Sequence, residues 1–209
     1  MKVLNYGSLN VDYVYSVDHI IVGGETQHSS KLEVFSGGKG LNQSIALAKA
    51  GVPVYHAGIV GTDGDILLEA CKEAGVNTKY IRRLPVKGGH TMIQVDKNAQ
   101  NCIILYGGTN QMQTKEFVDE VLADFGEGDY LMLQNEINML DYIIDQAYEK
   151  KMKIVMNPSP FDDKLSTCDL SKVYLFLVNE IEGEQITGCK DKDQILDAMA
   201  ARFPNARFV

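Results

Sequence analysis

The sequence of 209 residues lacks long apolar runs. No segment approaches the roughly 20 apolar residues that a transmembrane helix needs. The first seven residues hold no apolar region before a small-residue cleavage site, so no signal peptide is expected. Positive charge is also scarce, with 20 Lys and Arg against 28 Asp and Glu and a net charge of −8. This balance argues against a general nucleic-acid or membrane-surface binder, although a small anionic ligand is not excluded.

Cysteine is sparse and widely spaced. The four cysteines are Cys71, Cys102, Cys168 and Cys189, and none forms a Cys-x-x-Cys pair. We therefore expect four reduced, mostly buried thiols in a cytoplasmic protein rather than a disulfide framework. The four histidines occupy no His-Glu-x-x-His or other metal-ligand spacing, and we expect them in turn, lid or packing positions.

Several common functional motifs are absent. There is no Walker A loop, no Gly-x-Gly-x-x-Gly after the first strand and no Gly-x-Ser-x-Gly elbow. A Rossmann dinucleotide site is therefore not expected. Residues 61–65, Gly-Thr-Asp-Gly-Asp, look like a catalytic aspartate motif. We interpret them as a turn into the following helix, where Asp and Gly are common.

The sequence does contain a regular alternation of strand and helix patterns after about residue 40. Strands are predicted at 54–60, 130–133, 154–156 and 174–178, and helices at 66–74, 117–125, 139–151 and 191–203. Thr114 is a candidate N-cap for the second helix, and Asp191 and Gln194 have capping-box spacing at the last. This alternation predicts an α/β fold, a doubly wound and mostly parallel sheet with helices on both faces.

Two regions break the alternation with strand patterns alone. One contains β-like segments at 13–17 and 26–35, and the other reads as a hairpin of 90–96 and 101–106. We expect a small β-sheet lid, built from about residues 12–35 and 88–107, over the carboxyl edge of the main sheet. Because an uncovered face of such a sheet tends to become buried, we also expect a homodimer through this lid.

The last five residues, which end at Val209, resemble the beginning of another strand after the break at Pro204. A strand that stops so soon favours a chain that is truncated here, and a frayed terminus is the alternative. We therefore expect residues 1–209 to form the N-terminal portion of one α/β domain.

Residues 36–43 are the most informative segment. They place Gly37, Gly38, Lys39 and Gly40 just before the helix-forming residues 45–50. At a helix start, free backbone N–H groups and the positive end of the helix dipole favour a polar or anionic ligand. Lys39 can meet a hydroxyl group or an anion there.

Polar residues also follow several predicted strands. Asn10 and Asp12 come after a first predicted strand at residues 2–6 and point to one side. There they can bind adjacent sugar hydroxyls, although an Asx turn is the alternative. Glu136, Asn157 and Asn179 each end a later strand. The carboxyl edge is where ligand sites of open α/β sheets lie, and helix capping is the alternative for each residue.

Taken together, these segments resemble the ribokinase-like (pfkB) carbohydrate kinase family, with ribokinase as the nearest branch. The resemblance covers essentially the whole chain. It rests, in this order, on residues 7–12 (Gly-Ser-Leu-Asn-Val-Asp), 37–43 (Gly-Gly-Lys-Gly-Leu-Asn-Gln), 60–64 (Val-Gly-Thr-Asp-Gly), 157–160 (Asn-Pro-Ser-Pro) and 179–182 (Asn-Glu-Ile-Glu).

The resemblance implies transfer of the γ-phosphoryl group of ATP to a sugar hydroxymethyl group, most closely that of ribose, with Mg²⁺ and in some members K⁺. By position, the sugar would be held by Asn10, Asp12, Gly38, Lys39, Gly40, Asn42 and Glu136. Asn157 and Asn179 would lie on the ATP side, and Glu182 would order Mg²⁺ through water.

One motif of the family is missing. The catalytic aspartate of the family lies in a Gly-Ala-Gly-Asp motif, whose backbone N–H groups stabilise the transferring phosphoryl group, and this motif does not occur here. The resemblance therefore implies a catalytic aspartate beyond Val209, and no catalytic residue is assigned within the chain. The 209 residues are expected to be inactive alone. Two alternatives stay open, a non-catalytic sugar-binding or dimerisation module, and a kinase for fructose, another pentose or a nucleoside.

Overall fold

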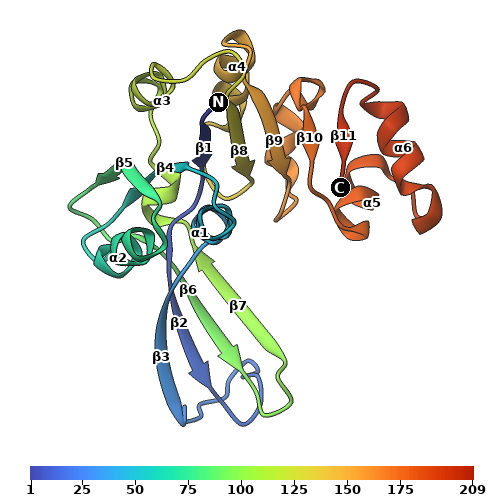
Figure 1. Cartoon of the computed structure of the whole chain (residues 1–209). Coiled ribbons are helices and arrows are strands. Elements are labelled where there is room, and N and C mark those ends of the chain that lie inside the picture. The colour runs from blue at the N-terminus through green and yellow to red at the C-terminus, as the bar shows by residue number, and fades with distance from the viewer.

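The computed structural model describes residues 1–209 and contains two sheets and six α-helices (Figure 1). The strands of the main sheet are β1 (Val3–Tyr6), β4 (Val54–Val60), β5 (Asn77–Arg83), β8 (Tyr130–Gln134), β9 (Lys153–Asn157), β10 (Leu175–Phe176) and β11 (Arg207–Phe208). The smaller sheet consists of β2 (Asn10–Ser16), β3 (Lys31–Gly37), β6 (Gly89–Val95) and β7 (Asn101–Tyr106). The helices are α1 (Lys39–Lys49), α2 (Asp65–Ala74), α3 (Lys115–Leu122), α4 (Leu140–Glu149), α5 (Glu180–Thr187) and α6 (Ile195–Arg202).

The main sheet is wholly parallel. Its strand order is β11-β10-β9-β8-β1-β4-β5, so the chain winds outward in both directions from β1. The smaller sheet has the order β3-β2-β6-β7 and mixes one parallel pair, β2 with β6, with two antiparallel pairs. The predicted fold class, a doubly wound α/β sheet with a small β lid, is confirmed.

Helices cover both faces of the main sheet because its central strands are apolar on both sides. On β1, Leu4 and Tyr6 belong to a core shared with α3, α4, α5 and α6. Val3 points the other way and packs with the core under α1 and α2. Side chains alternate across a strand, so this arrangement requires a helix layer on each face.

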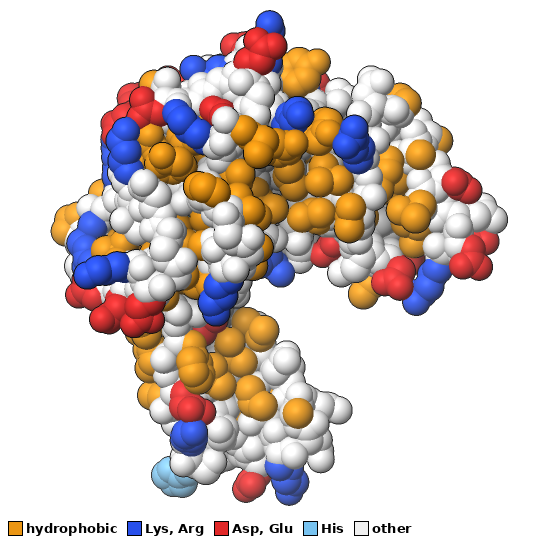
Figure 2. Space-filling view, in the orientation of Figure 1, with side chains coloured by type: hydrophobic (Ala, Val, Ile, Leu, Met, Phe, Trp, Pro, Cys, Tyr) orange, Lys and Arg blue, Asp and Glu red, His pale blue; other side chains and the backbone are white.

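The smaller sheet lies beyond the carboxyl ends of the main strands, toward which β8 and β9 point in Figure 1. Its hairpin of β6 and β7 matches the predicted one, whereas β3 begins at Lys31 and not at residue 26. Figure 2 shows hydrophobic side chains gathered on this lid. The large exposed hydrophobic residues on its strands are Leu32, Val34, Phe35, Met92, Ile103, Ile104, Leu105 and Tyr106.

Two predicted elements near the C-terminus differ from the structure. The strand predicted at 174–178 is reduced to the two residues of β10. The helix predicted from residue 191 begins as a 3₁₀ turn at Lys192–Gln194 and becomes α-helical only at Ile195. The Gln194 N–H donates to the carbonyl oxygen of Asp191 at 3.0 Å, and the Asp191 side chain accepts from the N–H of Asp193 instead, so the predicted capping box does not form.

The strand pattern predicted for the last five residues is present as β11, which pairs in parallel with β10. Val209 continues this pairing, because its N–H donates to the carbonyl oxygen of Phe176 at 3.0 Å. Its own carbonyl oxygen accepts from the N–H of Val178 at 2.9 Å. The backbone of residues 207–209 is therefore held by the sheet.

The cysteines are less buried than predicted. All four are free, but only Cys71 is buried and Cys102 is exposed on β7 of the lid. Successive side chains of β7 point to opposite faces of the lid, and both faces of this strand are exposed, so Cys102 meets solvent. None of the helices combines the length and the apolar character needed to cross a bilayer.

Candidate functional site

A cleft of about 320 Å³ lies between the lid and the carboxyl edge of the main sheet. Six residues that the sequence assigns to a sugar site line it, namely Asn10, Asp12, Gly38, Lys39, Asn42 and Glu136. The remaining lining residues are Thr91, Ile93, Ile103 and Leu105 from the lid, and Ser159 and Pro160 from the segment after β9. The structure therefore brings together residues from distant parts of the chain.

Residues 37–40, which we call the glycine segment, lead into α1 and fit closely against the connection between β1 and β2. Gly38 caps α1 with a φ of 96°, and a Cβ at this position would lie 2.9 Å from the carbonyl oxygen of Ser8. A Cβ on Gly40, which lies behind the cleft wall, would fall 2.4 Å from the backbone nitrogen of Ser8. Only glycine fits there. This contact places Lys39 and Asn42, on the first turn of α1, at the cleft.

Glu136 is bound at the N-terminus of α1. Its Oε2 accepts a hydrogen bond from the backbone N–H of Lys39 at 3.1 Å and another from the Ser8 hydroxyl. Ser8 Oγ in turn accepts from the N–H of Gly40 at 3.2 Å. The positive end of the helix favours a carboxylate at this place. Since these bonds occupy Oε2, Oε1 remains to accept a hydrogen bond from a ligand.

Asp12 projects from β2 toward the same cleft. Its Oδ1 accepts a hydrogen bond from Thr91 Oγ1 on β6 at 2.6 Å, which leaves Oδ2 for a ligand. Burial raises the pKa of the Asp12 carboxyl above its usual value, and the bond from Thr91 opposes this shift. A partly buried carboxylate gains more from a hydroxyl donor than one in open water.

Asn10 is oriented by Asn110, which is 1% exposed. Asn110 Nδ2 donates to Asn10 Oδ1 at 2.7 Å, and Asn110 Oδ1 accepts from the N–H of Leu9 at 3.0 Å. The NH₂ group of Asn10 is therefore left to donate to a ligand. Local sequence patterns predict no role for Asn110, Ser8 or Thr91, because each acts through a partner that is distant in sequence.

The cleft thus offers both acceptors and donors. Asp12 and Glu136 each contribute an open carboxylate oxygen, and Asn10 and Lys39 contribute donors. A hydroxyl group both donates and accepts, so adjacent hydroxyls suit this arrangement. Two carboxylates disfavour a phosphate in the same place, because like charges at short range repel.

The three residues predicted for the ATP side do not line this cleft. Asn157 Oδ1 accepts from the N–H of Ser159 at 3.0 Å, which turns the chain after β9. Asn179 and Glu182 form the capping box of α5, with the Glu182 N–H donating to Asn179 Oδ1 at 2.9 Å and the Asn179 N–H donating to Glu182 Oε2 at 3.1 Å. The capping alternative therefore describes the contacts of Asn179.

The carboxylates that line the cleft are those of Asp12 and Glu136, which the family resemblance predicts for the sugar. Val209 lies on the edge of the main sheet beside β10, its side chain is 76% exposed, and it does not line the cleft. The location of the catalytic aspartate beyond Val209 stays a prediction from the family resemblance.

The turn interpretation of residues 61–65 agrees with the structure. Gly64 caps α2, and Asp63 Oδ1 accepts from the N–H of Gly88 at 3.0 Å. Asp63 also forms a salt bridge with Lys87 at 2.7 Å. This aspartate joins the start of α2 to the segment that enters β6, and it is not among the residues of the cleft.

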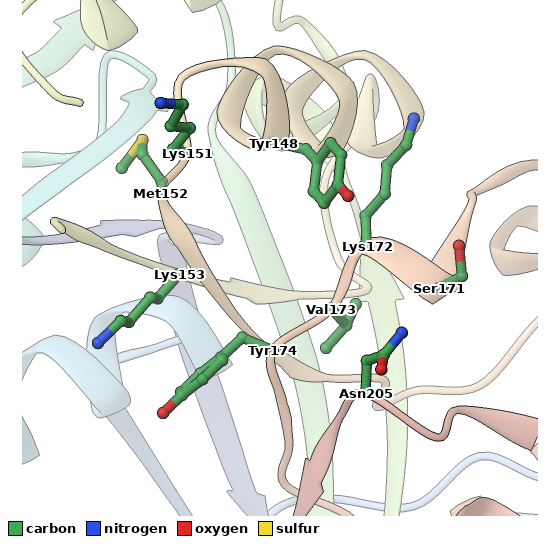
Figure 3. A pocket seen from close by; sticks show the side chains of 9 residues that line it. All are labelled: Tyr148, Lys151, Met152, Lys153, Ser171, Lys172, Val173, Tyr174 and Asn205. Carbon is green, nitrogen blue, oxygen red and sulfur yellow. The ribbon is translucent and has the colours of Figure 1, made fainter. Parts of the chain in front are cut away.

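Another hollow, of about 410 Å³, lies at the opposite, amino edge of the sheet (Figure 3). Tyr148 and Lys172 line one side of it, and Lys153 and Tyr174 the other. Lys172 is already paired with Asp145 at 2.7 Å. Ligands of open α/β sheets bind at the carboxyl edge, so we assign the functional site to the cleft under the lid.

Comparisons with known proteins agree with the geometry. Residues 1–208 of the sequence match a protein family described as "pfkB family carbohydrate kinase". The chain is similar to the ribokinase of Staphylococcus aureus (strain COL), at 34% identity over 195 residues, which are 90% of this chain and 64% of the relative. The ribokinase of Haemophilus influenzae is 31% identical over 196 residues, 90% of this chain and 63% of the relative.

A solved structure gives the same result. The crystal structure of ribokinase from Cryptococcus neoformans var. grubii serotype A in complex with ADP matches with a TM-score of 0.77 at 29% identity. The match covers 96% of this chain and 66% of that one. The chain thus spans slightly less than two thirds of the length of the curated relatives named above.

Proposed function

The chain belongs to the pfkB family of carbohydrate kinases, and on that premise we propose that its cleft binds ribose for phosphorylation by ATP. The observation that carries the proposal is the convergence of Asn10, Asp12, Lys39 and Glu136 on one cleft beneath the lid. These groups match the adjacent hydroxyls of a sugar. Ribose is favoured among sugars because both relatives described above are ribokinases.

A ligand screen by thermal shift tests this assignment. A sugar that binds only the folded protein stabilises it by RT ln(1 + [L]/Kd) and so raises its melting temperature. We expect a larger rise with ribose than with fructose or adenosine at the same concentration. A larger rise with fructose or with the nucleoside would assign the cleft to that substrate instead.

ATP is the proposed phosphoryl donor, and the ADP complex of the fungal ribokinase supports a nucleotide in this role. Glu182 keeps Oε1 free of the α5 capping box, which suits a water-mediated contact with Mg²⁺ better than direct ligation. Asn157 and Asn179 stand at the carboxyl edge as candidates for the nucleotide side. A role for K⁺ belongs to the same family-based proposal.

We also propose a cytoplasmic location. The four free cysteines support a reducing compartment of this kind.

We further expect the 209-residue polypeptide itself to show little turnover. It contains no Gly-Ala-Gly-Asp sequence to supply a base and backbone donors for the transferring group. Together these contributions are worth at least about 1,000-fold in rate. In a coupled assay, ribose-dependent ATP consumption should be lower by this factor than that of the Staphylococcus aureus relative. Comparable rates would show that another group of this chain acts as the base.

The exposed apolar residues of the lid support a homodimer. Burying Ile104, which is 61% exposed on the face of β7 away from the cleft, would stabilise a dimer by about 25 cal/mol for each Å² of apolar surface removed from water. Light scattering should give a mass about twice the 23.1 kDa of one chain. Ile104→Glu should shift the mass toward that of the monomer, because Ile104 lies on the face of β7 opposite Ile103, which lines the cleft. A monomeric mass for the unaltered protein at micromolar concentration would contradict the dimer.

A further inference from the structure

A group of buried polar residues lies directly beneath the glycine segment of the cleft. We define this buried polar network as Asn5 on β1, Ser44 on α1, His56 on β4 and Gln134 on β8. All four residues are completely inaccessible to solvent. Buried polar groups destabilise a protein unless they are hydrogen-bonded, so their partners show what the network does.

Hydrogen bonds in one half of the network determine which nitrogen of His56 carries the proton. Asn5 Nδ2 donates to Ser44 Oγ at 2.8 Å, so the Ser44 hydroxyl proton is free to go to His56 Nδ1 at 2.7 Å. His56 then carries its proton on Nε2, which donates to the carbonyl oxygen of Gly7 at 3.3 Å. Burial lowers the pKa of His56 to about 4, so the ring is neutral at neutral pH.

The other half of the network reaches α1 and β8. Asn5 Nδ2 also donates to the carbonyl oxygen of Gly40 at 2.6 Å. Gln134 Nε2 donates to Asn5 Oδ1 at 2.9 Å and to the side-chain oxygen of Gln43 at 2.5 Å. The network therefore holds the first turn of α1 at Gly40 and Gln43, and the end of β1 at Gly7.

These contacts lie just behind the groups that face the cleft. Gly40 follows Lys39, Gln43 follows Asn42, and Gln134 at the end of β8 precedes Glu136 by two residues. We propose that Asn5, Ser44, His56 and Gln134 are positioning residues, which hold Lys39 and Asn42 in register with Glu136. The role of the sugar in this inference rests on the proposed function, whereas the hold on the glycine segment does not.

An apolar interior would not supply the same constraint. Apolar contacts are non-directional, so a helix packed by them alone retains small shifts along the sheet. Hydrogen bonds in a low-dielectric interior are directional and specify one arrangement of the groups they join. Every side-chain polar atom of this network is paired except Gln134 Oε1, which is buried without a partner. The cleft needs that accuracy because a misplacement of about 1 Å is enough to weaken several directed hydrogen bonds together.

Two variants that replace polar groups of the network with apolar ones test the proposal. Gln134→Met removes the donors to Asn5 and Gln43, and the double variant Ser44→Ala/His56→Phe removes both partners of one bond, which limits the loss of stability. The matched control is Tyr6→Phe, which removes a buried hydroxyl bonded to Gln113 at 3.1 Å from the same strand, β1, but on its other face.

Hydrogen exchange and ribose titration provide two separate readouts. The N–H of Gly40 donates to Ser8 Oγ at 3.2 Å, and that of Leu41 donates to the Ser8 carbonyl oxygen at 3.0 Å. We expect both network variants to lose at least about tenfold in the protection of these two amides, with amides of α3 and α4 unchanged. Ribose Kd should rise by at least about tenfold. Tyr6→Phe should leave both readouts unchanged.

The outcomes separate this inference from the proposed function. If the two amides stay as protected as in the Tyr6→Phe control, or lose protection only together with all other amides, the inference is wrong. If protection falls locally but the unaltered protein binds no ribose, the network does hold the glycine segment and the assignment of ribose fails. A local loss of protection with no change in a measurable ribose Kd would overturn the link to the sugar.

Discussion

Replacing Gly37 with alanine should weaken ribose binding by about 100-fold while the protein stays folded. A Cβ at this position would lie 1.9 Å from Oδ2 and 2.5 Å from Cγ of Asp12. The carboxylate must therefore move, and it gives up both the Thr91 bond and its contact with the sugar. Loss of the hydrogen bonding between the sugar and this charged group, at about 1.5–3 kcal/mol, accounts for a factor of this size.

The control for this variant is Gly126→Ala. Like Gly37, Gly126 has no left-handed φ, and a Cβ there meets no atom within 4 Å. The melting temperature and the ribose Kd of the Gly126→Ala variant should equal those of the unaltered protein. Calorimetric titration with ribose measures the effect in both variants. If Gly37→Ala binds ribose within about threefold of the unaltered protein, the carboxylate of Asp12 does not contribute to the site as described.

Asp12→Ala should weaken ribose binding by a similar factor and leave nucleotide affinity unchanged. Asp12 lies on β2 at the lid end of the cleft, bonded to Thr91 on β6, and the candidates for the nucleotide side lie at the end of β9 and after β10. Removing a carboxylate that accepts hydroxyl protons costs about 2–3 kcal/mol of sugar binding. Titrations with ribose and with ATP on the same preparation test the difference, and equal losses for the two ligands would contradict the assignment.

The control for net charge is Glu33→Ala, which removes a lid carboxylate paired with Lys31 at 2.8 Å and absent from the cleft lining.

The ionisation of Asp12 adds a pH test. Because burial raises the pKa of this carboxyl, the fraction able to accept hydroxyl protons falls at a higher pH than for an exposed aspartate. Ribose affinity should therefore fall on acidification through that pKa, and Asp12→Asn should weaken this dependence, with Glu136 as the remaining carboxylate of the cleft.

The positions of the cleft residues were predictable because they follow recognisable local patterns. Asn10 and Asp12 come after the first strand, the glycines precede a helix, and Glu136 follows β8. The parallel sheet then brings such residues together at one edge, as an open α/β fold requires. Strand and helix periodicity was sufficient for this much of the fold.

The hydrogen-bond partners were not predictable in the same way. Ser8 reaches Glu136 across 128 positions, and Asn110 reaches Asn10 across 100, so no local pattern connects them. The same is true of His56, which reads as an ordinary strand residue. The C-terminal errors have a local cause, because Asp191 and Asn179 both have capping-box spacing and only the second forms the box.

The most direct test of the account is a crystal structure of the protein soaked with ribose. We predict one ribose under the lid, with hydroxyls bonded to Asp12 Oδ2, Glu136 Oε1 and the Lys39 ammonium group, which belong to residues lining the cleft. An ordered ribose at the amino edge beside Tyr148 and Lys172, or an empty cleft at a ribose concentration that saturates the protein in solution, would contradict the account.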